Sequence, residues 1–266
     1  MAANIMRYAA SFLFIGGIFL VLDLILYFLI KGKVKWQLII AIGILYFIAL
    51  LTIFSAISHK STGLGIVDEM KIEMVRASEI TITQYSKTGT VPADAQAVRE
   101  TIKSLIIRPL YGWILVSLFF LALLNYLFVR EIAKKHKKIE APMTQYRYWF
   151  GNEAIVWVFM ACVGAVMFSK PIKNELVTDI ALNIMVVLVN FYGLVGGAVA
   201  AYFIANIRIN KILSNILILL VAGMLLFANI FVVILFYLSI MILVPLGVFD
   251  TWFNFRKIDR GGLIWK

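Results

Sequence analysis

Four polar side chains that lie inside long apolar runs are the first candidates for chemistry in this sequence. They are Asp23, Asn125, Asn183 and Asn190. A carboxylate inside a membrane-length apolar run is costly to bury and is by default a candidate functional group. An asparagine in such a run commonly hydrogen-bonds to a neighbouring helix, and Asn183 and Asn190, seven residues apart, share one helix face. The four residues therefore either line a cavity that accepts a small molecule or stabilise contacts between helices.

Motifs for catalysis or metal binding are missing from the sequence. It contains no HExxH, GxSxG or P-loop pattern, no paired aspartates within an apolar run and no Cys/His cluster. An intramembrane hydrolase would need a nucleophile and an activating partner at matched depth. Cys162 is the only cysteine, and His59 and His136 are far apart in the sequence. We therefore expect a protein that is not an enzyme and has neither a metal nor a cofactor.

The elements that must position these residues are apolar runs of membrane length. The chain is 63% hydrophobic and only 15% charged, with a mean hydropathy of +0.96, far from the balance of a soluble domain. About 20 apolar residues span the hydrocarbon core of a bilayer as a helix. The apolar runs cover residues 9–30, 36–57, 109–129, 154–169, 180–207 and 212–249.

The last run is nearly twice the usual length, since it would form a helix of roughly 57 Å at about 1.5 Å per residue. We expect it to fold into two helices near Ala228 and Asn229. The predicted fold class is all-α, a polytopic transmembrane helical bundle of about seven spans, or six if 212–249 is one helix. Its predicted parts are 1–57 with two membrane helices, 58–108 outside the membrane, and 109–266 with the remaining spans.

The distribution of basic residues predicts the orientation. With seven spans, the segments 31–35, 130–149 and 208–211 and the C-terminal tail lie on one side and carry most of the Lys and Arg. The short segments opposite carry few bases, so the positive-inside rule places the N-terminus outside and the C-terminus in the cytoplasm. The net charge of +11 then indicates attraction to the lipid bilayer and its anionic headgroups. It does not indicate nucleic-acid binding.

The polar insertion at 58–108 has the pattern of two amphipathic helices joined by a turn. Ile66, Met70 and Met74 recur every four residues, and Gly89 and Pro92 break the segment. The insertion either packs on the membrane core of its own chain or serves as a lid or a partner-docking surface.

A stripe of small residues, Gly193, Gly197 and Ala201, runs along the fifth apolar segment. Such a stripe allows another helix backbone to approach closely. It serves packing within the chain or, as the alternative, a homo-oligomer.

The C-terminal sequence GVFDTWFNFRK ends the last apolar run on an acid, an aromatic cluster and two bases. We expect an interface anchor at the cytoplasmic side, made of Arg147, Trp149, Asp250, Trp252 and Arg256. If the last helix continues, Arg256 meets lipid phosphates and Asp250 pairs with a loop base such as Arg147 or with exposed backbone amides. This role is structural.

From residue 66 onward the sequence resembles the YybS-like bacterial membrane proteins, a family of unknown function. The resemblance rests on the order of VDEMKIEMVRASEITITQY, AVRETI, ALLNYLFVRE, QYRYW, NFYGL and GVFDTWFNFRK. These relatives usually carry about five spans before the polar insertion, where this chain has two. The resemblance implies a location in the bacterial cytoplasmic membrane with the insertion outside. It also implies distant kinship with the small-molecule-binding S subunits of energy-coupling-factor transporters and with MreD-like scaffolds.

Two functional hypotheses follow. In the first, the helices surround a cavity near the exported side that binds or transports a small molecule, with the insertion as its lid. In the second, the protein is a scaffold or assembly protein that acts on a membrane-protein partner.

Overall fold

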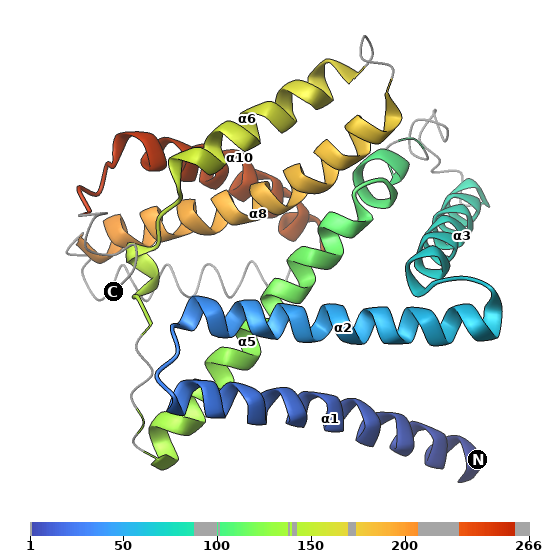
Figure 1. The fold of residues 1–266 in the computed structure, drawn as a ribbon. Helices are drawn as coiled ribbons and strands as arrows, with labels where there is room; N and C mark the ends of the chain where they lie inside the picture. The colour runs from blue at the N-terminus through green and yellow to red at the C-terminus, as the bar shows by residue number, and fades with distance from the viewer. Residues whose placement is uncertain are drawn as a thin grey trace. The chain divides into compact units, whose positions relative to one another are not determined.

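In the computed structural model, all secondary structure in the described part of the chain is helical (Figure 1). The structure describes residues 2–87, 100, 102–137, 139, 143–169, 174–206 and 229–258. The elements are α1 (Ala2–Lys31), α2 (Trp36–Thr62), α3 (Ile66–Lys87), the π-helical η1 (Lys103–Ile107), α5 (Leu110–Lys137), the 3₁₀-helical η2 (Tyr146–Tyr148), α6 (Glu153–Met167), α8 (Glu175–Asn206) and α10 (Asn229–Phe253). The predicted all-α class is confirmed.

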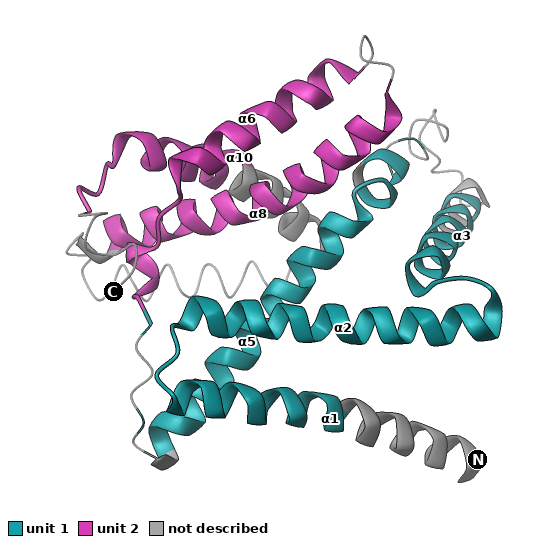
Figure 2. Cartoon of the chain, viewed as in Figure 1, with its two compact units in different colours: residues 1–143 teal, residues 144–266 magenta. Residues whose placement is uncertain are grey.

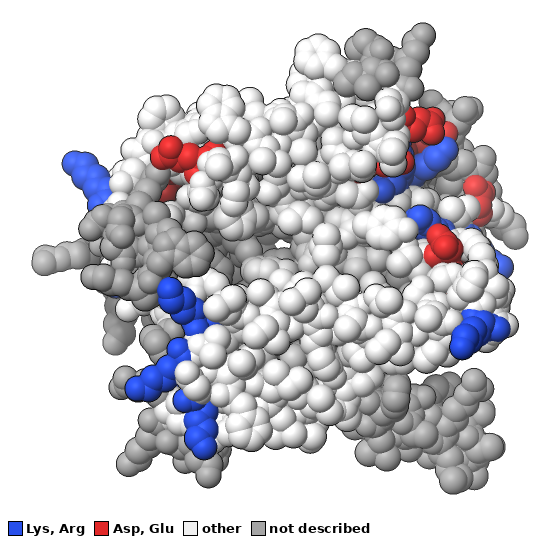
Figure 3. Space-filling model, viewed as in Figure 1, with Lys and Arg blue, Asp and Glu red and all other residues white. Residues whose placement is uncertain are grey.

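Three of the described helices are long and apolar enough to cross a membrane. They cover Trp36–Thr62, Leu110–Lys135 and Glu175–Ile204. Two shorter apolar helical segments cover Glu153–Met167 and Met241–Phe253. On the face shown in Figure 3, uncharged residues cover most of the surface, and the charged groups gather near the ends of the helices.

Parts of the last apolar run and of the predicted exported hairpin lie outside the described residues. The described residues of α10, Asn229–Phe253, fall within the second helix that the sequence predicts for the divided run. Residues 207–228, which would form the first, lie outside the described residues. The same holds for 88–99 in the predicted exported hairpin, of which α3 and η1 are described. The count of seven spans stays a prediction.

The chain divides into two compact units, residues 1–143 and 144–266 (Figure 2). The division falls inside the segment 130–149, because α5 packs on α1 and α2. The predicted parts 1–57, 58–108 and 109–266 stay a prediction. In unit 1, α5 crosses both of these helices (Figure 1). A Cβ on Gly43 of α2 would lie 3.0 Å from the Ala122 Cβ of α5, so these two backbones approach closely.

Unit 2 is built on α8, which packs against α6 and α10. Its core contains Val156, Tyr192, Val244 and Val248. The contact between α8 and α10 is a contact of backbones, because a Cβ on Gly196 would overlap the Leu243 carbonyl and one on Gly247 would overlap the Tyr192 carbonyl. Small residues allow such an approach between helices.

The closest contact between α8 and α10 is therefore made by Gly196, one residue before Gly197 of the predicted small-residue stripe. A Cβ on Gly193 would lie 3.9 Å from Val244 Cγ2, an ordinary contact, and one on Gly197 would meet the Tyr146 hydroxyl. Ala201 is half-buried. Both stripe glycines face groups of their own chain, and Gly196 makes the closest helix contact.

Candidate functional site

The C-terminal residues turn back onto the end of α10. The helix ends at Phe253, and Asn254 and Lys257 have φ values of 47° and 50°. The Asn254 side chain donates to the Ile258 carbonyl and accepts from the Ile258 N–H, both at 2.9 Å. This turn returns Arg256 to the last turn of the helix, so Arg256 does not continue the helical face of Phe249 and Phe253.

Arg256 makes a buried ion pair with Asp250. Its Nη2 and Nε lie 2.7 and 3.2 Å from Asp250 Oδ2, and the two side chains are 0% and 1% exposed. Its Nη1 and Nη2 also donate to the carbonyls of Arg147 and Trp149, both at 2.6 Å. We call Arg147, Trp149, Asp250 and Arg256 the C-terminal clasp.

The clasp supplies hydrogen-bond donors to backbone carbonyls just before α6. Residues 149–152 run without helical hydrogen bonds before α6, and a Cβ on Gly151 would meet Thr251 Oγ1 and Tyr192 Cε1. Irregular backbone in an apolar environment is tolerated only where its polar groups find partners. Arg256 supplies donors for the Trp149 carbonyl in this segment and for the Arg147 carbonyl in η2, and Asp250 neutralises its charge. The clasp binds the segment before α6 to the end of α10.

Two sequence expectations are wrong at this point. Arg256 does not reach lipid phosphates, because its guanidinium is buried against Asp250 and two carbonyls. Asp250 pairs with Arg256, while Arg147 contributes its carbonyl and stacks its guanidinium 4.9 Å from the centre of the Tyr148 ring. The interface roles of Trp149 and Trp252 stay predictions. Trp149 Nε1 donates to the Thr144 carbonyl, and the Trp252 ring lies 6.0 Å from that of Trp157.

The asparagines within the apolar helices each donate to their own helix. Asn125, Asn183 and Asn190 bind the carbonyls of Leu121, Asp179 and Val186, four residues earlier, at 2.9, 2.7 and 2.9 Å. The Oδ1 atom of Asp23 is buried and has no hydrogen-bond partner among the described residues. Asp23 and Asn125 belong to unit 1, and Asn183 and Asn190 to unit 2.

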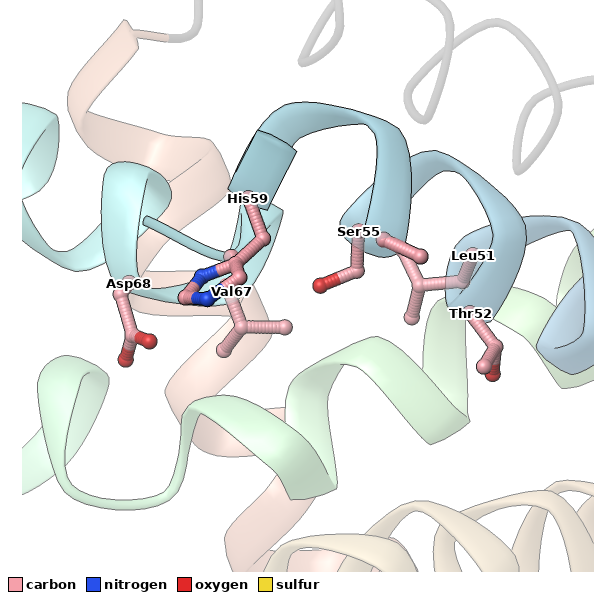
Figure 4. A pocket seen from close by; sticks show the side chains of 8 residues that line it. Leu51, Thr52, Ser55, His59, Val67 and Asp68 are labelled. Atoms are coloured by element: carbon pink, nitrogen blue, oxygen red, sulfur yellow. The ribbon is translucent and has the colours of Figure 1, made fainter. Parts of the chain in front are cut away.

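Unit 1 contains a pocket of about 450 Å³ between the end of α2 and the start of α3 (Figure 4). Its lining residues are Leu51, Thr52, Ser55, Ala56, His59, Gly65, Val67 and Asp68. Figure 4 shows Ser55 and His59 one turn apart on α2 and Asp68 on the first turn of α3. None of the four intramembrane polar residues singled out from the sequence lines this pocket.

A tight reversal forms the pocket. Gly63 ends α2 in the left-handed conformation, φ 78°, and its N–H donates to the His59 carbonyl. A Cβ on Gly65 would lie 2.8 Å from Ser55 Oγ, so the chain passes directly over the serine. Glycine accepts both the left-handed turn and the close approach. Ser55 and His59 of α2 therefore lie near the start of α3, and Thr52 lies one turn earlier on α2 (Figure 4).

Glu69 secures this reversal. Its Oε1 accepts hydrogen bonds from Ser58 Oγ at 2.8 Å and Thr62 Oγ1 at 2.6 Å. The hydrogen bonds from Thr62 and Ser58 lower the pKa of the Glu69 carboxyl, because they stabilise its charged form. Glu69 thus attaches the start of α3 to the end of α2.

Among the residues that the structure describes, the pocket lining carries one carboxylate and no lysine or arginine. Lys71 lies outside it, where its Nζ is 3.7 Å from Asp68 Oδ1 and 5.0 Å from the centre of the Tyr111 ring. No group of three His, Cys, Asp or Glu side chains able to hold a metal occurs among the described residues.

The sequence analysis missed this pocket, although a signal was present. Thr52, Ser55 and His59 recur at spacings of three and four in the last turns of an otherwise apolar helix. That spacing places them on one face, and two glycines follow. Each residue alone is ordinary at a helix end, and their convergence with Asp68 depends on the reversal.

In a comparison with known proteins, one family model matches most of the chain. A family model described as "Predicted membrane protein (DUF2232)" matches residues 4–251. The match includes the two N-terminal helices, whereas the resemblance in the sequence motifs begins at residue 66. No curated protein and no solved structure matches the chain.

Proposed function

The chain belongs to the DUF2232 family of predicted membrane proteins, and from this premise we propose that it is a non-enzymatic membrane protein that binds a small molecule. The observation that carries the proposal is the polar pocket between α2 and α3. Ligand pockets measure about 300–1,000 Å³ and combine apolar walls with a few convergent polar groups. At about 450 Å³, with Ser55, His59 and Asp68 beside apolar side chains, this pocket matches that range in volume and lining, and it is an open groove at the surface.

The position of the pocket supports the same function. It forms where a membrane-length helix, α2, ends and the polar insertion begins. We propose, from the asymmetry of the basic loops, that this end lies outside the bacterial cytoplasmic membrane. The ligand then enters from the extracytoplasmic side, and the first turn of α3 covers it as a lid.

The arrangement of the pocket side chains favours binding over catalysis. Ser55, His59 and Asp68 are the residue types of a hydrolytic triad, which requires hydrogen bonds from nucleophile to base and from base to acid. In the structure, no hydrogen bond joins any two of these three side chains. They are separate polar contacts available to a ligand.

Native mass spectrometry from mild detergent tests the proposal with two adjacent substitutions. Ala56→Trp fills the pocket, whereas Ile57→Trp adds the same volume at an exposed position that does not line it. We expect a bound small molecule in the wild type and in Ile57→Trp, and its loss in Ala56→Trp. A wild-type spectrum without a bound small molecule, or equal occupancy in both variants, would contradict the proposal.

A second candidate, an assembly protein, is favoured by the surface of α3. This strongly charged helix exposes Ile72, Val75 and Ile80 by 46%, 45% and 52%. Apolar side chains on a polar helix are typical of partner contacts. The same native spectra separate the candidates, because an assembly protein leaves the membrane with a protein partner. Crosslinking in native membranes that finds only a solitary monomer would exclude the second candidate.

A further inference from the structure

We propose that the pocket between α2 and α3 takes a small organic cation, a protonated amine attached to a short apolar group. The inference rests on the proposed function and adds the chemical class of the ligand. Its basis is the sign of the charge in the pocket and the position of the one carboxylate.

The negative charge of Asp68 in the pocket lining favours a cationic ligand. Among the described residues, Asp68 is the only acid in the lining, and the lining contains no lysine or arginine. Lys71 lies outside the lining and pairs with Asp68 Oδ1 at 3.7 Å. An anionic ligand would be placed beside a like charge, and a neutral one could donate a hydrogen bond to the carboxylate but would lack the attraction between opposite charges. An ammonium group gains both the attraction and the hydrogen bond.

The two oxygens of Asp68 have different surroundings. Oδ1 faces Lys71, whose Nζ is 3.7 Å away, longer than a hydrogen bond. Oδ2 lies 3.7 Å from the Cβ position of Gly65, which lines the pocket. Lys71 is also held over the Tyr111 ring. The ligand ammonium therefore binds Oδ2 and leaves the Lys71 contact in place.

The remaining lining residues suit such a ligand. Thr52 lies at the opposite end of the pocket from Asp68 (Figure 4), and its hydroxyl, whose Oγ1 donates to the Ile48 carbonyl at 2.9 Å, adds no charge there. Leu51, Ala56 and Val67 supply apolar contacts. Together these groups match a molecule with an ammonium at one end and a short hydrocarbon part.

Three probes of equal length test the class: n-butylammonium, 1-butanol and butyrate. Binding is measured by ligand-observed NMR with the full chain in lipid nanodiscs, in the wild type and two variants. Asp68→Asn removes the pocket charge. Glu73→Gln is its matched control, because Glu73 lies on the same helix, pairs with Arg76 and does not line the pocket.

We expect the wild type to bind n-butylammonium at least about tenfold more tightly than either other probe. Asp68→Asn should reduce the ratio of ammonium to alcohol affinity to about one without abolishing alcohol binding, and Glu73→Gln should leave the ratio unchanged. Equal binding of the three probes, preference for butyrate, or a preference that survives in Asp68→Asn would overturn the cation assignment while leaving a binding pocket. Absence of binding by all three, together with no effect of Ala56→Trp on native spectra, would overturn the proposed function itself.

Discussion

Arg256 shows how one side chain can determine the local fold. Its guanidinium pairs with the Asp250 carboxylate. It also donates to two backbone carbonyls in a segment more than 100 residues earlier. Breaking a buried ion pair leaves an uncompensated charge, which costs about 3–5 kcal/mol. Removing both partners is often tolerated, because no charge remains. Here the carbonyls of Arg147 and Trp149 would still lose their donors, and each unsatisfied buried carbonyl costs about 1–3 kcal/mol.

We therefore expect Arg256→Ala, Asp250→Ala and the double variant Asp250→Ala, Arg256→Ala all to lower accumulation in the membrane fraction and the midpoint of thermal unfolding. Lys257→Ala is the control, since the exposed neighbour of Arg256 has a similar charge without these contacts. The decisive comparison is the double variant. If it accumulates normally, the carbonyl contacts do not hold the fold, and the structural role of the clasp is wrong.

At the scale of elements, the pairing of α8 with α10 depends on glycine positions that the sequence indicates only approximately. The sequence pattern predicts the correct helix and a close contact, but it cannot fix which face meets the partner. The phase of the contact is set by α10, whose Leu243 and Gly247 meet Gly196 and Tyr192. The clasp was missed for a related reason, because the positive φ angles of Asn254 and Lys257 end a helix that hydropathy alone would extend.

The glycine contact gives a matched pair of substitutions on α8. Gly196→Ala would overlap the Leu243 backbone, which cannot move as a side chain can, so we expect a loss of about 1–3 kcal/mol in the free energy of unfolding. Gly193→Ala would make only an ordinary contact with Val244 Cγ2 and should be close to neutral. Denaturant unfolding in detergent measures both. Equal losses of unfolding free energy in the two variants would show that the α8 backbone at Gly196 does not approach the Leu243 backbone of α10 this closely.

The attachment of α3 to α2 should depend on pH. The folded pKa of Glu69 is lowered from its ordinary value of 4.5, so the unfolded state binds a proton at a higher pH than the folded state. Its contribution to stability is then fully present above pH 4.5 and is lost as the pH falls through the folded pKa. The protection of amides in the first turn of α3 against hydrogen exchange, taken relative to the intrinsic rate at each pH, should decrease at acidic pH. Glu69→Gln should show the reduced protection already at pH 7 with no further decrease on acidification, whereas a wild-type-like profile in this variant would rule out the attachment.

For the whole molecule, composition and apolar run length were sufficient to predict a helical membrane protein, because the bilayer permits few other solutions. The functional sites were not predictable in the same way. The pocket and the clasp both depend on short non-helical segments, at Gly63 and Gly65 and at Asn254 to Ile258, where a few backbone angles bring distant side chains together. Hydropathy contains no information about those angles.

The orientation is the last prediction, and it decides which solution the pocket faces. The basic loops predict Lys33 in the cytoplasm and Lys60, beside the pocket, outside. The chain has one native cysteine, the buried Cys162, so single-cysteine variants on a Cys162→Ala background can test this with a membrane-impermeant maleimide. Lys60→Cys should react in intact cells, and Lys33→Cys only after permeabilisation. Both positions are exposed, Lys33 in the turn after α1 and Lys60 in the last turn of α2, so a difference between them reports sidedness. The opposite pattern would reverse the topology and make the pocket a receptor for cytoplasmic amines.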